Sequence, residues 1–165
     1  MTEIVIRKLT SDDAEDFRKI RLAALKKSPE MFGSTYMVES KRPIEMFIER
    51  LTNNVIFAAY QNKQILGVII FHQESGLKAS HKANLFGFFI EPKYRNQGIA
   101  SKLLQTAIQY GQQCVEQITL SVVSNNTSAI HLYQKHGFKV YGIEPRSMKS
   151  ECGYQDETFM ILLLA

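Results

Sequence analysis

Residues 91–101 read EPKYRNQGIAS, and this stretch is the most informative in the chain. It follows an apolar run that ends at Ile90, and a run with apolar residues at helical spacing comes after it. Pro92 ends the strand and Gly98 lies in a short polar turn, so the sequence predicts a strand, a turn and a helix. Amides at the start of such a helix lack intrahelical partners and can hold a phosphate group. The alternative is that Gly98 only eases a tight turn.

A predicted strand over 83–90, a helix over 98–111 and a strand over 117–123 form a βαβ unit around this stretch. Elsewhere the pattern predicts strands over 3–7, 55–60, 65–72, 138–143 and 158–164, and helices capped by Ser11, starting at Pro43 and over 129–136. Residues 29–39 and 144–157 are expected to be loops. This order predicts an α/β (α+β) fold: a mixed, mostly antiparallel sheet of six to seven strands with helices on both faces and a central βαβ unit.

The composition is that of a globular protein, with 165 residues, 45% apolar residues and 22% charged residues. This length predicts a single domain over residues 1–165. The net charge of +4 suits an anionic ligand but is too small to indicate nucleic-acid binding. The longest apolar run, residues 159–165, is too short to span a membrane, and the N-terminus lacks signal-peptide features. We therefore expect a cytoplasmic protein.

Two segments of the chain resemble the signatures of the GNAT superfamily of acyl-CoA-dependent N-acyltransferases. Arg95 to Ala100 matches the pattern Arg/Gln-x-x-Gly-x-Gly/Ala, and Asn126 to Phe138 matches Asn-x-x-Ala-x-x-x-Tyr-x-x-x-Gly-Phe. The predicted order of elements matches that family across essentially the whole chain. The nucleotide-binding patterns G-x-G-x-x-G and G-x-x-x-x-G-K-[ST] are absent from the sequence.

The resemblance implies a role for each matched residue. The backbone of Phe88, Phe89 and Ile90 would pair with the pantetheine arm of acetyl-CoA, and an N–H near Ile90 would stabilise the charged carbonyl oxygen. Asn126 would contact the same arm, and Tyr133 would protonate the departing thiolate, although Tyr133 also fits the role of a core residue. Arg95 would add charge to the pyrophosphate site. The amides that would hold the pyrophosphate belong to Asn96, Gln97, Gly98, Ile99, Ala100 and Ser101.

The implied activity is transfer of an acetyl group from acetyl-CoA to a primary amine of a small molecule, peptide or protein, by direct attack in a ternary complex and without a metal. Cys114 and Cys152 have no histidine at a diagnostic spacing, so neither supports a covalent acyl-enzyme. The alternative is a non-catalytic acyl-CoA-binding sensor. We expect no nucleic-acid or membrane partner, and the resemblance leaves a homodimer open.

Many members of the family place a glutamate on the fourth or fifth strand as the general base, and here Ser121 occupies that place. A buried hydroxyl bonded to backbone is the expected role of Ser121. His131 and His136 lie about one turn apart on a helix without a third ligand, so no metal site is expected. For the charged residues on the surrounding loops we expect solvated surface roles, and we name no base among them: Glu30, Glu39, His72, Glu144, Asp156 and Glu157.

Overall fold

The computed structural model describes residues 2–165, whose seven strands form one mixed sheet with hydrogen-bonded neighbours in the order β1-β2-β3-β4-β5-β7-β6. The strands are β1 (Ile4–Lys8), β2 (Val55–Gln61), β3 (Gln64–Gln73), β4 (Lys82–Ile90), β5 (Gln117–Val123), β6 (Lys139–Ser150) and β7 (Gly153–Leu163). The α-helices are α1 (Ala14–Lys27), α2 (Tyr36–Glu39), α3 (Ile44–Asn53), α4 (Ile99–Gly111) and α5 (Thr127–Lys135). The predicted fold class is confirmed.

The chain divides into two compact units. The first runs to His72 and resumes over Leu85–Tyr110, and the second holds Gln73–Asn84 and Gly111–Ala165. Strand β4 therefore contributes its first residues to the second unit and its last six to the first. The single domain over residues 1–165 stays a prediction.

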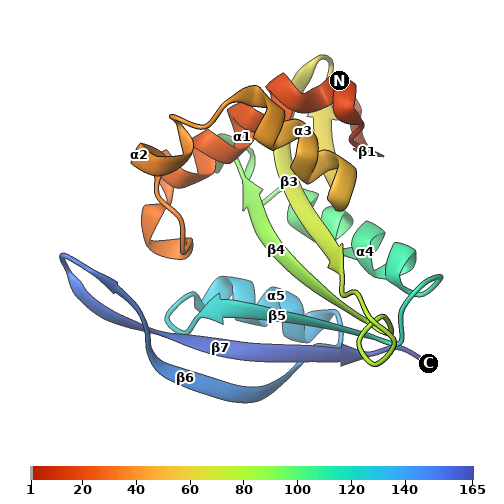
Figure 1. Ribbon diagram of the computed structural model, residues 1–165, viewed down its shortest axis with the longest axis vertical. Coiled ribbons are helices and arrows are strands. Elements are labelled where there is room, and N and C mark those ends of the chain that lie inside the picture. The colour runs from red at the N-terminus through yellow and green to blue at the C-terminus, as the bar shows by residue number, and fades with distance from the viewer. Residues whose placement is uncertain (1) are drawn as a thin grey trace. The chain divides into compact units, whose positions relative to one another are not determined.

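In the first unit, strands β2 and β3 bury side chains on both faces. On one face, Phe57 and Phe71 pack edge-on against Tyr110 of α4, with ring centroids 5.8 and 5.1 Å away. On the other face, α1 and α3 cover the sheet (Figure 1). Burial on both faces explains why these strands are almost continuously apolar in sequence. The core on the α1 and α3 side includes Phe17, Ile20, Phe47, Leu51, Ile56, Ala58, Tyr60, Val68, Ile70 and Phe89.

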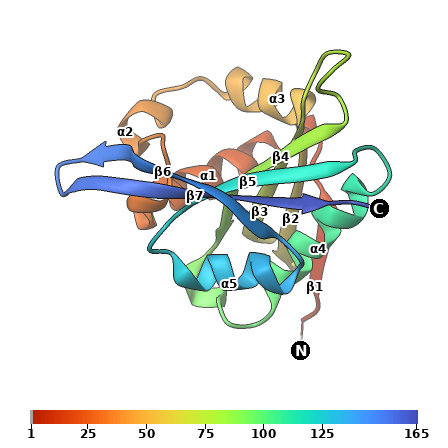
Figure 2. The ribbon, with the colours of Figure 1, turned by 90° about the horizontal axis from the view of Figure 1, so that it is seen from below.

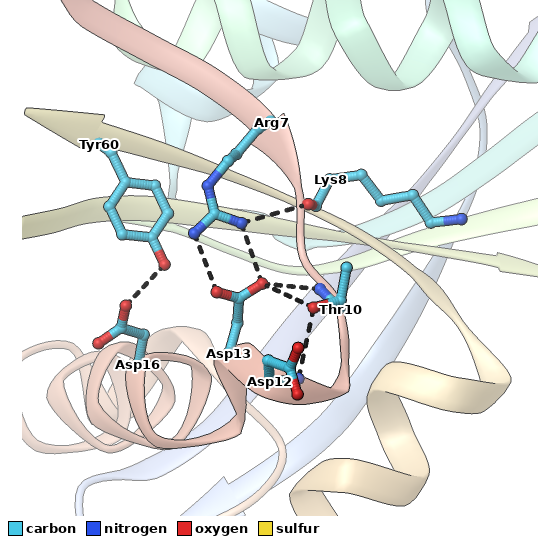
Figure 3. A network of polar contacts seen from close by, with 7 residues as sticks. All are labelled: Arg7, Lys8, Thr10, Asp12, Asp13, Asp16 and Tyr60. Carbon is cyan, nitrogen blue, oxygen red and sulfur yellow. Dashed lines mark hydrogen bonds and ion pairs between the residues drawn. The ribbon is translucent and has the colours of Figure 1, made fainter. Parts of the chain in front are cut away.

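A polar network anchors the start of α1 to the strands β1 and β2 (Figure 3). Arg7 forms a two-point ion pair with Asp13, with both N–O distances 2.9 Å, and Tyr60 donates a hydrogen bond to Asp16 at 2.8 Å. The side chain of Thr10 caps a 3-10 turn over Ser11–Asp13, and α1 follows at Ala14. The prediction of Ser11 as the cap was wrong by one residue, because Thr10 and Asp13 form a capping box.

In the second unit, β7 pairs antiparallel with both β5 and β6. Strands β6 and β7 form a long hairpin, whose strands lie side by side in both views (Figures 1 and 2). The predicted loop over 144–157 was therefore wrong: most of it belongs to these strands. Most residues of β6 are exposed, so this strand lacks the apolar alternation that reveals a strand in sequence.

The segment 29–39, which the sequence predicts to be a loop, also contains regular structure. A 3-10 turn covers Pro29–Met31, and α2 follows a cap in which the Thr35 side chain accepts from the amide of Val38. A single helical turn is too short to show a helical period. None of the helices described for residues 2–165 is long and apolar enough to cross a membrane.

Candidate active site

Strand β4 departs from regular geometry at Gly87, where φ is +60°. This φ favours glycine, and a Cβ atom here would lie 2.8 Å from Ile70 Cδ1, so the end of the Ile70 side chain would have to shift. Beyond Gly87, Phe88 is half-buried, and Phe89 and Ile90 are buried. The three residues expected to carry the pantetheine arm therefore follow directly on an interruption of the strand.

The side chain of Arg95 ties the following turn back to the end of β4. Its Nε–H donates to the carbonyl oxygen of Ile90 at 3.0 Å, and its Nη2 donates to Ser28 Oγ at 3.5 Å. An ion pair of 2.6 Å between Lys27 and Glu91 joins the end of α1 to the same turn. Because these bonds hold both sides of the turn, Arg95 has a positioning role in addition to the charge it supplies.

The turn from Asn96 to Gly98 leaves backbone amides without acceptors. Asn96 and Gly98 have φ values of +62° and +80°, and both are exposed. The first bond into α4 runs from the amide of Lys102 to the carbonyl of Gly98, at 3.1 Å. Within residues 2–165, no backbone carbonyl accepts from the amides of residues 97–100. Unpartnered amides in a left-handed turn at a helix start are an anion-binding arrangement.

The other two expected site residues lie in the second unit, at the start and middle of α5. The Asn126 side chain caps this helix by accepting from the amide of Ala129 at 3.3 Å. Tyr133 is buried, with 8% of its surface exposed, and its ring packs edge-on against Phe138 at 5.7 Å. Burial raises the pKa of Tyr133, so its phenol keeps its proton at neutral pH. Tyr133 is thus a core residue that holds a proton.

Ser121 lies on β5 opposite Phe159 of β7, and its side chain is exposed. The expectation of a buried hydroxyl was wrong, because Leu120 and Val122 take the buried face of β5 and Ser121 takes the other. No carboxylate stands at this position.

Glu39 is 2% exposed and lies between two arginines, so the expected solvated surface role was wrong. Arg21 donates to it at 3.3 and 3.2 Å, and Arg50 donates to it at 3.0 and 3.5 Å. Burial raises the pKa of Glu39, but the hydrogen bonds from Arg50 and Arg21 outweigh burial and lower it overall. A carboxylate held in its charged form in this way is a structural anchor and a poor proton acceptor.

The other candidate bases are less buried than Glu39. Glu30, Glu144 and Asp156 are exposed, as expected, whereas His72 and Glu157 are half-buried. His72 Nδ1 lies 2.7 Å from the side-chain oxygen of Asn54. These positions single out no general base.

The described part of the chain contains no group of three metal-ligating side chains. His131 is exposed and His136 is half-buried, and burial lowers the pKa of His136. Cys114 and Cys152 are exposed, and the partial burial of Cys114 raises the pKa of its thiol. A raised pKa disfavours the thiolate that a covalent mechanism would need.

Two residues, one within β4 and one beside it, were not singled out from the sequence. Gly87 had a readable signal, because a glycine inside an apolar strand often marks an interruption of the pleat. Arg21 of α1 lies with its Nη1 3.8 Å from the position of a Cβ on Gly87. The sequence gives no signal for Arg21, since its place depends on the packing of α1 against β4.

Comparison with known proteins agrees with this geometry. The sequence model described as "Acetyltransferase (GNAT) family" matches residues 16–138. An L-amino acid N-acetyltransferase from Escherichia coli K12 is 28% identical over 165 residues, which are 97% of this chain and 98% of that protein. A spermine/spermidine N(1)-acetyltransferase from Bacillus subtilis is 39% identical over 57 residues, covering 33% of this chain and 38% of that protein.

Solved structures share the fold over almost the whole chain. A GNAT-family acetyltransferase from Streptococcus pneumoniae superposes with a TM-score of 0.87 at 25% identity, covering 99% of this chain and 100% of that one. A Salmonella typhimurium structure solved with acetyl-CoA has a TM-score of 0.85 at 20% identity, covering 99% and 95%. The family match spans most of the chain and includes the turn at 95–101, so this chain belongs to the GNAT family and is an N-acetyltransferase.

Proposed function

We propose that this enzyme transfers an acetyl group from acetyl-CoA to a primary amine by direct attack in a ternary complex. The observation that carries the proposal is the turn after β4, where the amides of residues 97–100 donate to no backbone carbonyl in the described chain. These amides fit the pyrophosphate of the cosubstrate, because they are hydrogen-bond donors grouped at the start of a helix, where an anion is favoured. The neighbour from Salmonella typhimurium, which was solved with acetyl-CoA, supports the same choice.

The residues on either side of this turn would bind the rest of acetyl-CoA. Phe88 to Ile90 would pair with the pantetheine arm through their backbone, as an added strand pairs with a sheet. The carbonyl oxygen of Ile90 already accepts from Arg95, so it is not available as a further strong acceptor on that side. In the second unit, Asn126 would contact the arm near the start of α5.

The chemistry requires little more than positioning and one proton. Acetyl-CoA supplies a thioester, whose carbonyl carbon bonds to the amine nitrogen while the carbon–sulfur bond breaks. The N–H near Ile90 would stabilise the oxygen that gathers negative charge. Tyr133 would pass its proton to the departing sulfur, and its raised pKa keeps that proton available. The proton of the ammonium acceptor would leave through water, since no described residue is assigned as its base.

The test is Tyr133→Phe, which removes the phenol hydroxyl and keeps the ring against Phe138. We expect turnover to fall about 100-fold or more while the affinity for acetyl-CoA, measured by calorimetry, changes little. Tyr141→Phe is the matched control, because Tyr141 is an exposed tyrosine in the same unit. Turnover should be unchanged in this control.

The alternative function, an acyl-CoA-binding sensor, predicts a different pattern. A sensor would bind acetyl-CoA but show no amine-dependent release of CoA in the wild-type protein. Equal turnover in wild type and Tyr133→Phe would instead remove Tyr133 from the mechanism while leaving the acetyltransferase activity in place.

The acceptor is less defined than the donor. The relatives are named for two kinds of amine, an L-amino acid in one case and spermine or spermidine in another. These acceptors differ in charge: an amino acid carries a carboxylate beside its amine, whereas a polyamine carries only positive charges. The charge of the protein near β4 therefore decides which of these two kinds of acceptor is favoured.

A further inference from the structure

Arg21 lies against the part of β4 that precedes the proposed acyl-binding residues. Its Nη1 is 3.8 Å from the position that a Cβ on Gly87 would take. Its guanidinium carbon lies 5.3 Å from the ring centre of Phe32, and the Phe32 ring packs edge-on against Phe89 at 6.5 Å. The guanidinium therefore lies between Gly87 of β4 and the Phe32 ring, which itself packs on Phe89.

The hydrogen bonds of Arg21 leave one nitrogen unused. Nε and Nη2 donate to Glu39, whereas Nη1 has no acceptor among residues 2–165. The unused nitrogen is the one beside Gly87. The Arg21 side chain is only 12% exposed, so a charged partner at Nη1 would be poorly screened by water. Arg21 thus presents fixed N–H donors toward β4.

The charges around Arg21 do not balance. Glu39 is shared between Arg21 and Arg50, and Arg18 donates to the neighbouring carbonyl of Ser40 at 3.1 Å. These three guanidinium groups and the one carboxylate together carry a net charge of +2. Two of the acidic residues at the start of α1, Asp13 and Asp16, are already engaged by Arg7 and Tyr60 (Figure 3). This environment repels a polycation and attracts an anion.

We propose that Arg21 binds a carboxylate of the acceptor, so that the preferred acceptors carry a carboxylate close to the reacting amine, as α-amino acids do. The inference rests on the proposed acetyl transfer and adds the acceptor class and the residue that selects it. Arginine suits this role because its planar guanidinium can hold one carboxylate through Nε and Nη2 and still donate from Nη1. Polyamines are then poor acceptors.

The experiment compares each proteinogenic amino acid with its methyl ester, and includes spermidine, as acceptors for the full-length enzyme. We expect the wild type to favour the free acid over its ester by about 10- to 100-fold in kcat/KM, the effect of one charge-assisted hydrogen bond. Arg21→Gln should lose this preference, mainly through a higher KM for the acid. Arg21→Lys keeps the charge and should retain part of it.

The matched control is Arg50→Gln, which removes the other arginine on Glu39 and leaves the donor beside Gly87 in place. The preference for the acid should persist in this control. If Arg50→Gln abolishes it as Arg21→Gln does, Arg21 acts only by holding Glu39, and the inference is overturned. Equal use of acid and ester by the wild type, or better use of spermidine, also overturns it. Absence of turnover with every amine overturns the proposed acetyl transfer itself.

Discussion

The turn at 95–101 and the cluster of Arg21, Glu39 and Arg50 offer positive charge in two different ways. In the turn, the donors are backbone amides, oriented by two left-handed residues within one short segment. In the cluster, the donors are side chains from α1 and α3 gathered on a carboxylate at the end of α2. The donors of the turn should therefore be insensitive to truncation of the side chains at residues 96–100, whereas the cluster should depend on each charged group.

The largest expected effect comes from removing the carboxylate of the cluster. Glu39→Ala leaves two arginines facing each other in a largely buried place, so we expect a loss of about 3–5 kcal/mol in the free energy of unfolding. Urea unfolding measures this loss. Glu30→Ala removes an exposed glutamate of the neighbouring segment and should change stability little. Equal effects of the two substitutions would mean that the ion pairs contribute nothing.

The second-largest expected effect comes from placing a negative charge in the turn at 95–101. Gly98→Glu places a carboxylate beside the unpartnered amides, and nothing lies within 4 Å of its Cβ. We expect the affinity for acetyl-CoA, measured by calorimetry, to fall about 100-fold, because like charges meet at the pyrophosphate. Gly76→Glu is the control, since Gly76 has a φ of +102° and equally open surroundings outside the turn. A similar loss of affinity in the control would mean that backbone strain, and not the added charge, causes the effect.

A smaller effect concerns the ion pair at the start of α1. The hydrogen bond from Arg7 lowers the pKa of Asp13 from 3.8 to about 2. A carboxyl with a lowered pKa stabilises the fold above pH 4, and this contribution is lost as the pH falls toward 2. We expect wild type to lose about 1–2 kcal/mol of stability in this interval relative to Asp13→Asn. Parallel acid-unfolding curves for the two proteins would contradict this assignment.

The smallest expected effect is Asn96→Gly in the turn. Glycine adopts the left-handed conformation of Asn96 at no steric cost, so the amides should keep their orientation. We expect the affinity for acetyl-CoA to stay within about twofold of wild type. A large loss would show that the Asn96 side chain itself contacts the cosubstrate, and would remove the contrast with the cluster.

The turn and the start of α5 could be predicted from sequence because the conformation of each depends on residues that are adjacent in the chain. Gly98 indicates a left-handed turn, and Asn126 indicates the cap at the start of a helix. Glu39 could not be predicted, since its partners Arg21 and Arg50 lie 18 and 11 residues away and meet only after the helices pack. The outer part of the hairpin of β6 and β7 was missed for another reason: its exposed strands carry no apolar period over 144–157.

The exposed edge of β6 has a consequence for association of the protein with other chains. Val140, Tyr141 and Ile143 are exposed on this outermost strand, which leaves its backbone open to pairing with an added strand. Pro145 has no N–H, and the register shifts between Glu144 and Met148. Pairing along this edge is therefore interrupted at Pro145, so any intermolecular ladder on β6 is divided into short stretches on either side of it.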